Sequence, residues 1–280
     1  MADASRKSIL CPNCRRLIST DEPRCPHCGI AAPGSRWKNN PLTRGWGTDD
    51  RLIRIILYTN IAMFLFSLVI SKGITSAGFN PLRMLSPSTR GLALLGATGT
   101  LMIRDVGWWT LISANYLHGG ILHIFFNMMA FYQIAPLITR LFGTNRFFVI
   151  YTISGVGGFL VSCFMGTPIT IGASAALFGL IGAALYYGKS RGGVFGDAIY
   201  KQIGGWAIAI IAFGFLIPQI NNSAHIGGMV FGGLSAMILG YSEKSRETTA
   251  HRMLAGVCLI ITVLVLLFAL FRGLVFGLGV

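Results

Sequence analysis

The chain contains few charged residues and very few acidic ones. Asp, Glu, Lys and Arg together make up 11% of its 280 residues, and only nine are Asp or Glu. A soluble domain usually carries about 25% charged residues, so a water-soluble fold is excluded. Six Cys are too few for a disulfide scaffold, and the 36 Gly follow no triplet period, which excludes collagen. Apolar residues form 53% of the chain and the mean hydropathy is +0.65, which excludes disorder and indicates a polytopic membrane protein.

Long apolar segments begin at Leu52, whereas none lies near the N-terminus, where Asp3 stands. We therefore expect no cleaved signal peptide. A membrane-spanning helix needs about 20 residues, and we predict an all-α protein with seven of them. The predicted spans are 52–71, 113–136, 146–165, 169–187, 203–218, 223–241 and 253–271.

The distribution of Lys and Arg predicts the orientation, because cytoplasmic loops are enriched in these residues. Ten lie before the first span or in its first turn, and more follow the second, fourth and sixth spans. We expect a multi-pass protein of the cell membrane with its N-terminus in the cytoplasm and its C-terminus outside. The net charge of +14 then belongs to the inner face of a protein in a lipid bilayer and requires no nucleic-acid partner. Five of the 23 basic residues lie on the other side: Lys72, Arg83, Arg90, Arg104 and Arg272.

The polar N-terminal segment carries two Cys-x-x-Cys pairs, Cys11-Pro-Asn-Cys14 and Cys25-Pro-His-Cys28. Two such pairs can place four thiolates around one tetrahedral Zn²⁺, so we predict a structural zinc site in a zinc-ribbon-like module. Two disulfides or an iron–sulfur centre are the alternatives, and a reducing cytoplasm disfavours the disulfides. Protein would fill all four coordination positions, so this metal would not be catalytic. Modules of this kind usually recognise other molecules, so we expect a protein partner for it.

The changes in composition divide the chain into four parts. Residues 1–30 form the zinc-ribbon-like module and residues 31–50 a basic linker. Residues 51–241 form a six-span membrane core, and residues 242–280 contain the seventh span and the C-terminus.

Three predicted spans carry strongly polar residues, which are functional candidates wherever they lie inside a membrane. The second contains His123 and Asn127, the fourth Ser174 and the sixth His225. Plainer alternatives exist: Ser commonly bonds the carbonyl one turn back, a single His often only packs, and Asn127 suits an interhelical contact. All three spans enter from the predicted outer face. At 1.5 Å per residue we expect His123 about 15 Å, Ser174 about 8 Å and His225 about 3 Å into the bilayer.

This combination predicts a Ser–His dyad that needs no cofactor for catalysis. Ser174 is a weak nucleophile until His225 takes its proton, which His225 then gives to the leaving amine. No predicted span contains Asp or Glu, so we expect no third, acidic member. His123 and Asn127 share a helix face and, with the Ser174 backbone N–H, would form an oxyanion hole. Phe178, one turn after Ser174, would stack on the His225 ring.

These motifs resemble those of the rhomboid family of intramembrane serine proteases, over roughly residues 52–241. The likeness is specific because three motifs occur in the family's order on alternate spans. They are His123-x-x-x-Asn127, Gly172-x-Ser174 and Ala224-His225-x-x-Gly228.

The resemblance implies a six-helix bundle extended by a seventh C-terminal helix. It implies that Ser174 and His225 are the dyad and that His123 and Asn127 are oxyanion donors. It also implies that residues 72–112 form a membrane-embedded first loop and that a substrate helix enters beside the fifth span.

Two positions depart from the family pattern. Where the family has a Trp-Arg pair before the second helix, this chain has Trp109-Thr110, so the Arg that anchors the first loop is missing or replaced. Ala175 stands where Gly often follows the nucleophile, which places a methyl group beside the predicted oxyanion hole.

The leading hypothesis is a serine endopeptidase that cleaves membrane proteins in or near a transmembrane segment. A helix hides its carbonyls, so substrates must unwind, and small or helix-breaking residues at the cut lower that cost. One alternative is a catalytically inactive rhomboid-like protein that binds membrane clients, but such proteins usually lack the Ser or the His. Another is a transporter or channel, which would carry polar groups deep along a path, not only in the outer half.

Overall fold

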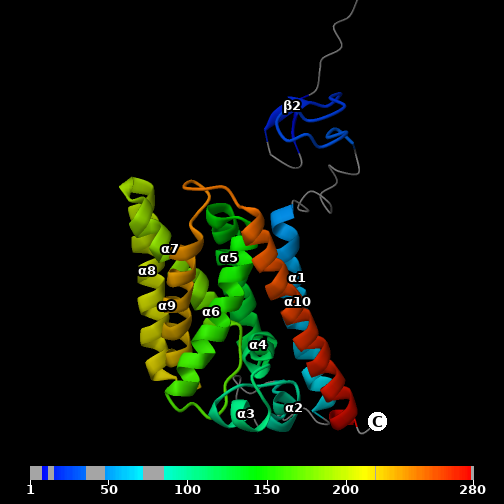
Figure 1. Cartoon of the computed structure of the whole chain (residues 1–280), viewed down its shortest axis with the longest axis vertical. Coiled ribbons are helices and arrows are strands. Elements are labelled where there is room, and N and C mark those ends of the chain that lie inside the picture. Colours follow the sequence, from blue (N-terminus) through cyan, green and yellow to red (C-terminus); the bar gives the residue numbers. More distant parts are fainter. Residues whose placement is uncertain (1–7, 12–15, 36–47, 72–84, 218, 279–280) are drawn as a thin grey trace, which may run out of the picture. The chain divides into compact units, whose positions relative to one another are not determined.

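The computed structural model describes residues 8–11, 16–35, 48–71, 85–217 and 219–278 (Figure 1). The chain forms two compact units, Met1–Arg54 and Ile55–Val280. Part of the predicted linker and part of the predicted first loop, at 36–47 and 72–84, lie outside the described residues.

The N-terminal unit contains a two-stranded antiparallel sheet of β1 (Ser8–Leu10) and β2 (Leu17–Ser19). The Cys11 N–H donates to the carbonyl of Arg16, and the Cys25 N–H donates in the same way to that of Ile30, both at 2.9 Å. The first cysteine of each Cys-x-x-Cys pair therefore donates its backbone N–H to the carbonyl five residues later. The Cys11, Cys25 and Ile18 side chains form a small buried core.

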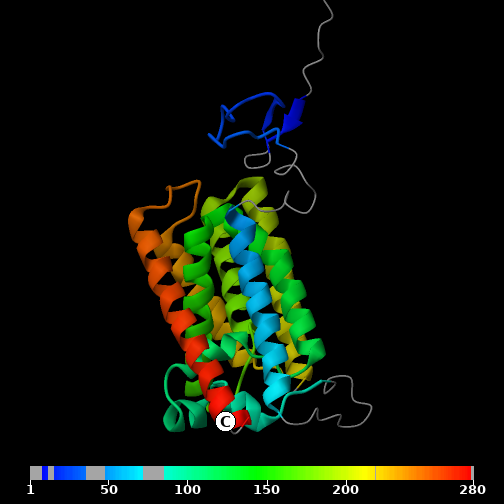
Figure 2. The same cartoon turned by 90° about the vertical axis from the view of Figure 1, so that its right-hand side faces the viewer.

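The membrane unit consists of helices that run side by side, with short helices across one end of the bundle (Figure 2). Their small residues and apolar stretches allow this packing. The elements are α1 (Thr48–Ile70), α2 (Thr89–Leu94), α3 (Thr100–Asp105), α4 (Thr110–Ser113), η2 (Ala114–Tyr116), α5 (Ile121–Phe142), α6 (Thr144–Phe164), α7 (Ser174–Arg191), α8 (Gly193–Leu216), α9 (Asn222–Leu239), α10 (Thr249–Arg272) and η3 (Gly273–Leu278).

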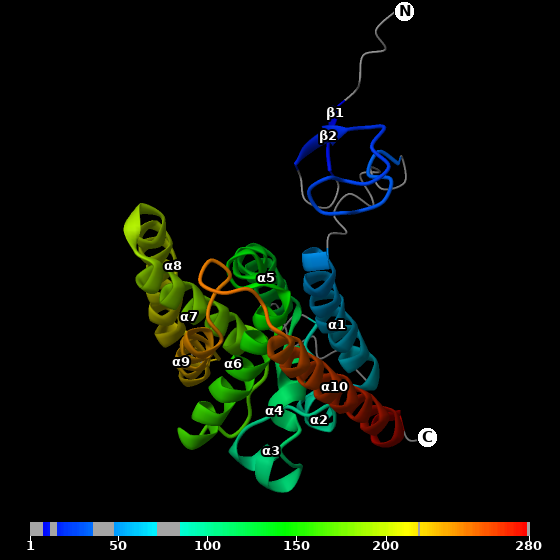
Figure 3. The same ribbon diagram turned by 45° about the horizontal axis from the view of Figure 1, so that its top comes forward.

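Five of these helices are long and apolar enough to cross a membrane, namely α1, α5, α6, α8 and α10. This confirms five of the seven predicted spans by length and composition. The other two predicted spans correspond to α7 and α9, which have 18 residues each and are rich in Gly and Ala. Most of α7 is buried, and it packs against α6, α8 and α9 (Figure 3). Small residues therefore replace large apolar ones here because these helices face other helices.

Three predicted span starts were wrong. The second span starts at Ile121, eight residues later than predicted, because α4 and η2 occupy the preceding residues. The fourth starts at Ser174, since the residues before it hydrogen-bond to the segment around Thr98. The fifth starts at Gly193, because Gly192 and Gly193, with φ of +64° and +66°, turn the chain directly from α7 into α8. Left-handed backbone of this kind favours Gly.

Helices α7 and α9 pack closely against each other. A Cβ atom added to Gly228 would lie 2.1 Å from the carbonyl oxygen of Ala175, and one added to Gly232 would lie 2.0 Å from that of Gly179. Both distances are shorter than any real contact of a Cβ atom. The two glycines on α9 therefore set the separation of these two helices, as small residues do in other membrane bundles.

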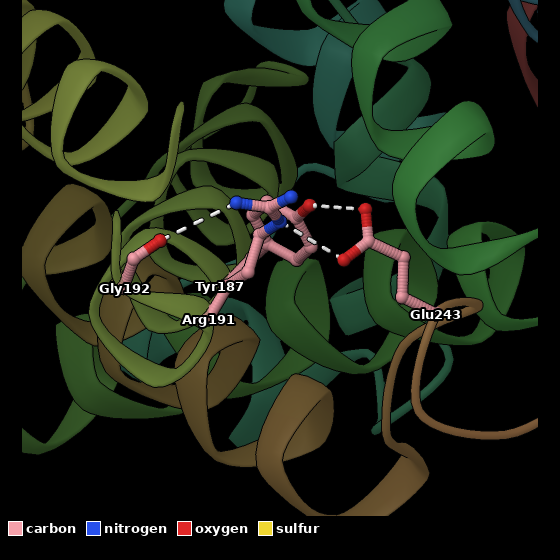
Figure 4. Close-up of polar contacts among 4 residues, drawn as sticks. All are labelled: Tyr187, Arg191, Gly192 and Glu243. Carbon is pink, nitrogen blue, oxygen red and sulfur yellow. Dashed lines mark hydrogen bonds and ion pairs between the residues drawn. The ribbon is translucent and has the colours of Figure 1, made fainter. Parts of the chain in front are cut away.

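At the end where α7 and α9 finish, the connection from α9 to α10 ties the helices together with charged groups. Glu243 accepts hydrogen bonds from the Tyr187 hydroxyl at 3.0 Å and from Arg191 Nε at 2.9 Å (Figure 4). Arg191 also lies over the ring of Phe195 on α8. One carboxylate thus joins the connection to the corner between α7 and α8.

A second carboxylate in the same connection caps α6. Glu247 accepts hydrogen bonds from the backbone N–H groups of Asn145 and Arg146, at 2.8 and 2.9 Å, and from the Asn145 side chain at 2.7 Å. The buried Arg146 guanidinium donates to the carbonyl and the hydroxyl of Ser245, both at 2.9 Å. A carboxylate at a helix N-terminus satisfies N–H groups that have no partner within the helix.

Candidate active site

The predicted site residues lie in the first turns of three helices. His123 is the third residue of α5, Ser174 the first of α7 and His225 the fourth of α9. All three helices start at the end of the bundle opposite to Glu243, which follows the end of α9. Because α5 and α7 start later than expected, His123 and Ser174 lie closer to the starts of their helices than predicted, and their depths of about 15 Å and 8 Å in a bilayer stay predictions. At 1.5 Å per residue, all three lie within about 5 Å of a helix start.

The contact between α7 and α9 at this end is a ring stack. The Phe178 and His225 rings lie parallel, with centroids 4.2 Å apart and an interplanar angle of 10°. Phe178 follows Ser174 by one helical turn, so the imidazole lies beside the face of α7 that carries Ser174. His225 is 5% exposed, and its Nδ1 atom makes no hydrogen bond within the described residues. The predicted stacking is present.

Ser174 is partly exposed, in contrast to its buried neighbours Ala173 and Ala175. No hydrogen bond joins its hydroxyl to the His225 ring in the part of the chain that the structure describes. Contacts between catalytic groups are often long without substrate and shorten when substrate binds. As the first residue of α7, Ser174 also has a backbone N–H with no acceptor inside the helix.

The hydrogen bonds of His123 define which ring nitrogen carries the proton. The Gly119 backbone N–H donates to Nδ1 at 3.2 Å, so Nδ1 is an acceptor and the neutral ring carries its proton on Nε2. A Cβ atom added to Gly172 would lie 2.8 Å from this Nε2 and 3.8 Å from Ser174 Oγ. The His123 Nε2–H donor and the Ser174 hydroxyl thus both face the space beside the Gly172 Cα atom. Gly172 has a φ of +123°, which together with this crowding requires glycine.

Asn127 follows His123 by one turn on α5 and is 7% exposed. Its side-chain NH₂ donates to the His123 carbonyl at 2.9 Å, and its Oδ1 makes no hydrogen bond within the described residues. One hydrogen of the Asn127 side-chain NH₂ is therefore donated within α5, and the other is available to donate to a further acceptor.

Comparisons with known proteins identify the family of this chain. The family model described as the rhomboid domain matches residues 105–242. RHOMBOID-like protein 2 of Arabidopsis thaliana is 30% identical over 228 residues, which cover 72% of this chain and 71% of the relative. This chain belongs to the rhomboid family. It is an integral membrane protein.

Two further relatives share a smaller part of their length with this rhomboid. Rhomboid protease GluP of Bacillus subtilis is 34% identical over 175 residues, which cover 62% of this chain and 34% of that protein. RHOMBOID-like protein 5 of Arabidopsis thaliana is 36% identical over 169 residues, which cover 58% of this chain and 54% of the relative. The matched region thus spans about a third to a half of these two proteins.

The departure of this rhomboid at Thr110 has a structural counterpart. Thr110 is fully buried, and its hydroxyl lies 3.1 Å from that of Thr98 and 2.8 Å from the carbonyl of Gly107. The guanidinium of Arg272, at the end of α10, lies 5.2 Å from the centre of the Trp109 ring. The seventh helix therefore brings an Arg against Trp109, the residue before Thr110.

Asn221 connects the segments around the site, although it was not among the predicted residues. Asn221 is the N-cap of α9. Its Oδ1 accepts a hydrogen bond at 3.1 Å from the backbone N–H of Ala224, the residue before His225. Its NH₂ donates to the hydroxyls of Ser162 at 2.6 Å and Thr170 at 3.0 Å. Asn is a common N-cap residue. The position of Asn221 just before the sixth predicted span was therefore a signal that could have identified it.

The N-terminal unit offers a metal site. The Cys11, Cys25 and Cys28 sulfur atoms all lie within 4.8 Å of one another. The Cys11 and Cys28 sulfurs are 3.7 Å apart, close to the separation of about 3.8 Å for two thiolates bound at 2.3 Å to a tetrahedral Zn²⁺, and far longer than the ~2.05 Å of a disulfide. Cys14, the fourth predicted ligand, lies outside the described residues.

Proposed function

We propose that this rhomboid is an intramembrane serine endopeptidase that hydrolyses peptide bonds in or near the transmembrane segments of membrane proteins. In this proposal Ser174 is the nucleophile and His225 is the general base. The observation that carries it is the stack of the His225 ring on Phe178, one turn from Ser174. The curated name of the relative in Bacillus subtilis also supports a protease.

The reaction requires two proton transfers by His225. Its Nε2 atom takes the Ser174 proton while Oγ bonds to the substrate carbonyl carbon, and the imidazolium then protonates the amine as the C–N bond breaks. Water, activated by the same imidazole, hydrolyses the acyl-enzyme and regenerates the Ser174 hydroxyl. Because Nδ1 has no partner among the described residues, we assign the orientation of the ring to Phe178.

The negative charge that develops on the carbonyl oxygen needs donors already in position. We propose the His123 Nε2–H, the remaining Asn127 N–H and the Ser174 backbone N–H. The protonation of His123 on Nε2, inferred from the bond that its Nδ1 accepts, supports the first. The start of α7 at Ser174, which leaves its N–H without a helical acceptor, supports the third.

The substrate would be a transmembrane helix that unwinds where it meets the site. We propose entry beside α8, because only five of its 24 residues are buried. We also propose that the chain lies in the cell membrane with its N-terminus in the cytoplasm, so that the site opens toward the outer face. The basic residues near the opposite end of the bundle support this orientation.

The decisive experiment compares Ser174→Ala with Ser190→Ala, which changes an exposed Ser at the other end of the same helix. Each is purified in detergent, labelled with a fluorophosphonate probe and incubated with a model transmembrane substrate. We expect Ser174→Ala to lose both labelling and cleavage while unfolding at the same temperature as the parent. Cleavage that persists in this variant contradicts Ser174 as the nucleophile. A parent that binds the substrate without cleaving it supports the alternative, an inactive rhomboid that holds membrane clients.

For the N-terminal unit we propose a structural zinc held by Cys11, Cys14, Cys25 and Cys28, in a module that binds a protein partner. The spacing of the Cys11 and Cys28 sulfurs supports a tetrahedral thiolate site. We expect about one zinc per purified chain, and its loss when Cys11 and Cys14 are replaced by Ser, with probe labelling of Ser174 unchanged. Protein purified without zinc would contradict the assignment.

A further inference from the structure

A small cavity lies between the seventh helix and the segment that leads into α5. Its walls come from α4, η2, α6 and α10, and include Asn115, Tyr151, Thr152 and Thr262. The space open to the centre of a water molecule measures about 10 Å³, close to what one water requires.

Four polar atoms on this wall make no hydrogen bond of normal geometry within the described residues, although the Tyr151 hydroxyl faces the Asn60 side chain and Thr262 faces the Tyr116 hydroxyl. They are Asn115 Oδ1, Tyr151 OH, Thr152 Oγ1 and Thr262 Oγ1, and all four atoms are buried. Buried polar atoms nearly always have a partner in protein or ordered water, and inside a bilayer no bulk water is present to supply one. Donors and acceptors from three separate segments thus border one space of the size of a water molecule.

We propose that this cavity binds an ordered water molecule that bridges α10 to α6 and η2. The hydroxyls of Thr152, Tyr151 and Thr262 can each donate or accept, and Asn115 Oδ1 accepts. Water needs two to four partners to remain in a buried site, and the wall offers four. Polar lining distinguishes this cavity from an apolar one, which would stay dry.

The bridge would connect a helix outside the matched rhomboid domain to the backbone next to the site. Thr262 belongs to α10, which follows the matched residues 105–242. Asn115 follows Ala114, whose carbonyl accepts the Gly172 N–H at 2.9 Å, two residues before Ser174. The water therefore gives α10 a polar attachment to the segment that borders Ser174, in addition to its apolar contacts.

Replacing Thr by the isosteric Val tests the water through the sign of the stability change. If a water joins Thr152 and Thr262, removal of either hydroxyl leaves the water and the other groups with fewer partners, so the variant is less stable. We expect Thr262→Val and Thr152→Val each to lower the unfolding temperature in detergent by about 2–4 °C, and Thr262→Ser to restore most of the loss. In a dry cavity the same changes remove an unpaired polar atom, so an equal or higher unfolding temperature overturns the proposal.

Double variants separate a water bridge from a direct bond, because the Tyr116 hydroxyl faces Thr262. With a shared water, the double variant of Thr152 and Thr262 loses less than the sum of the two single changes. If the losses of Thr152→Val and Thr262→Val are additive, and Thr262→Val and Tyr116→Phe are coupled, then Thr262 bonds directly to Tyr116 and the proposal is overturned. A crystal structure at about 2 Å resolution gives an independent check, and it must contain an ordered water in contact with Thr262. None of these measurements depends on proteolytic activity.

Discussion

Where α5, α7 and α9 begin, the helices are joined by uncharged groups: the Phe178–His225 stack, the Asn221 hydrogen bonds and the glycine contacts of α9. At the other end, two carboxylates of the α9–α10 connection bind Arg191, Tyr187 and the start of α6. The contacts at the first end depend on close packing, and those at the other end depend on charged hydrogen bonds. Charge is costly within the hydrocarbon but not at its surface, so a site below the surface must be held by packing. A methyl group in the wrong place is therefore the strongest perturbation at the site end, and loss of a carboxylate is the strongest at the other.

The largest expected effect comes from Gly228→Ala. Its Cβ would lie 2.1 Å from the Ala175 carbonyl oxygen, so α7 and α9 must move apart. We expect a loss of about 3 kcal/mol in unfolding free energy and at least a tenfold loss in cleavage. The control is Gly256→Ala on α10, where a Cβ meets nothing within 4 Å. Equal behaviour of the two variants would show that this contact does not position the site.

Next in size is Glu247→Ala at the opposite end. It leaves the N–H groups of Asn145 and Arg146 without their acceptor, so we expect a loss of about 2 kcal/mol. Cleavage by the folded fraction should not change, because the site lies at the other end. Arg191→Gln provides the comparison, since it removes the Arg191–Glu243 ion pair, whose side chains are 34% and 54% exposed, and this pair should contribute below about 1 kcal/mol. A strong effect of Glu247→Ala on kcat would contradict the independence of the two ends.

Phe178→Leu tests the stack, because it removes the aromatic ring and keeps an apolar side chain between α7 and α9. Aromatic stacking contributes about 0.5–1.5 kcal/mol, so we expect kcat to fall about three- to tenfold with KM nearly unchanged. Phe126→Leu, a change on the exposed part of α5, is the control. If both variants cleave at the parent rate, another group orients the imidazole.

The smallest effect is expected for Arg272→Gln, which removes the cation over Trp109. We predict a loss of about 0.5 kcal/mol in stability, measured by thermal unfolding in detergent. Arg252→Gln changes an exposed Arg near the start of the same helix and should have no measurable effect. An equal result for the two would mean that Arg272 does not take the place of the family's Arg in anchoring this segment.

Hydropathy predicted seven spans, of which five are confirmed by length and composition, and it came within a few residues of both ends of α1, α6, α9 and α10. It placed the start of α5 too early, because the short helices before it are as apolar as a span. The spacing of four between Ser174 and Phe178 predicted the contact with His225, since residues one turn apart share a face. No comparable pattern connects Arg272 to Trp109 or Glu247 to Asn145, because each pair depends on the docking of α10 and its connection.

The sequence by itself determined that the chain is a membrane protein of the rhomboid family, and it predicted which residues form a dyad and which cysteines bind a metal. These conclusions follow from composition and from spacing within one helix or one turn, where geometry is fixed by the backbone. Only the tertiary structure decided that the polar residues lie in first turns, that Asn221 joins three segments and that α10 reaches Trp109. Those features depend on contacts between residues far apart in the sequence, which exist only once the helices have packed.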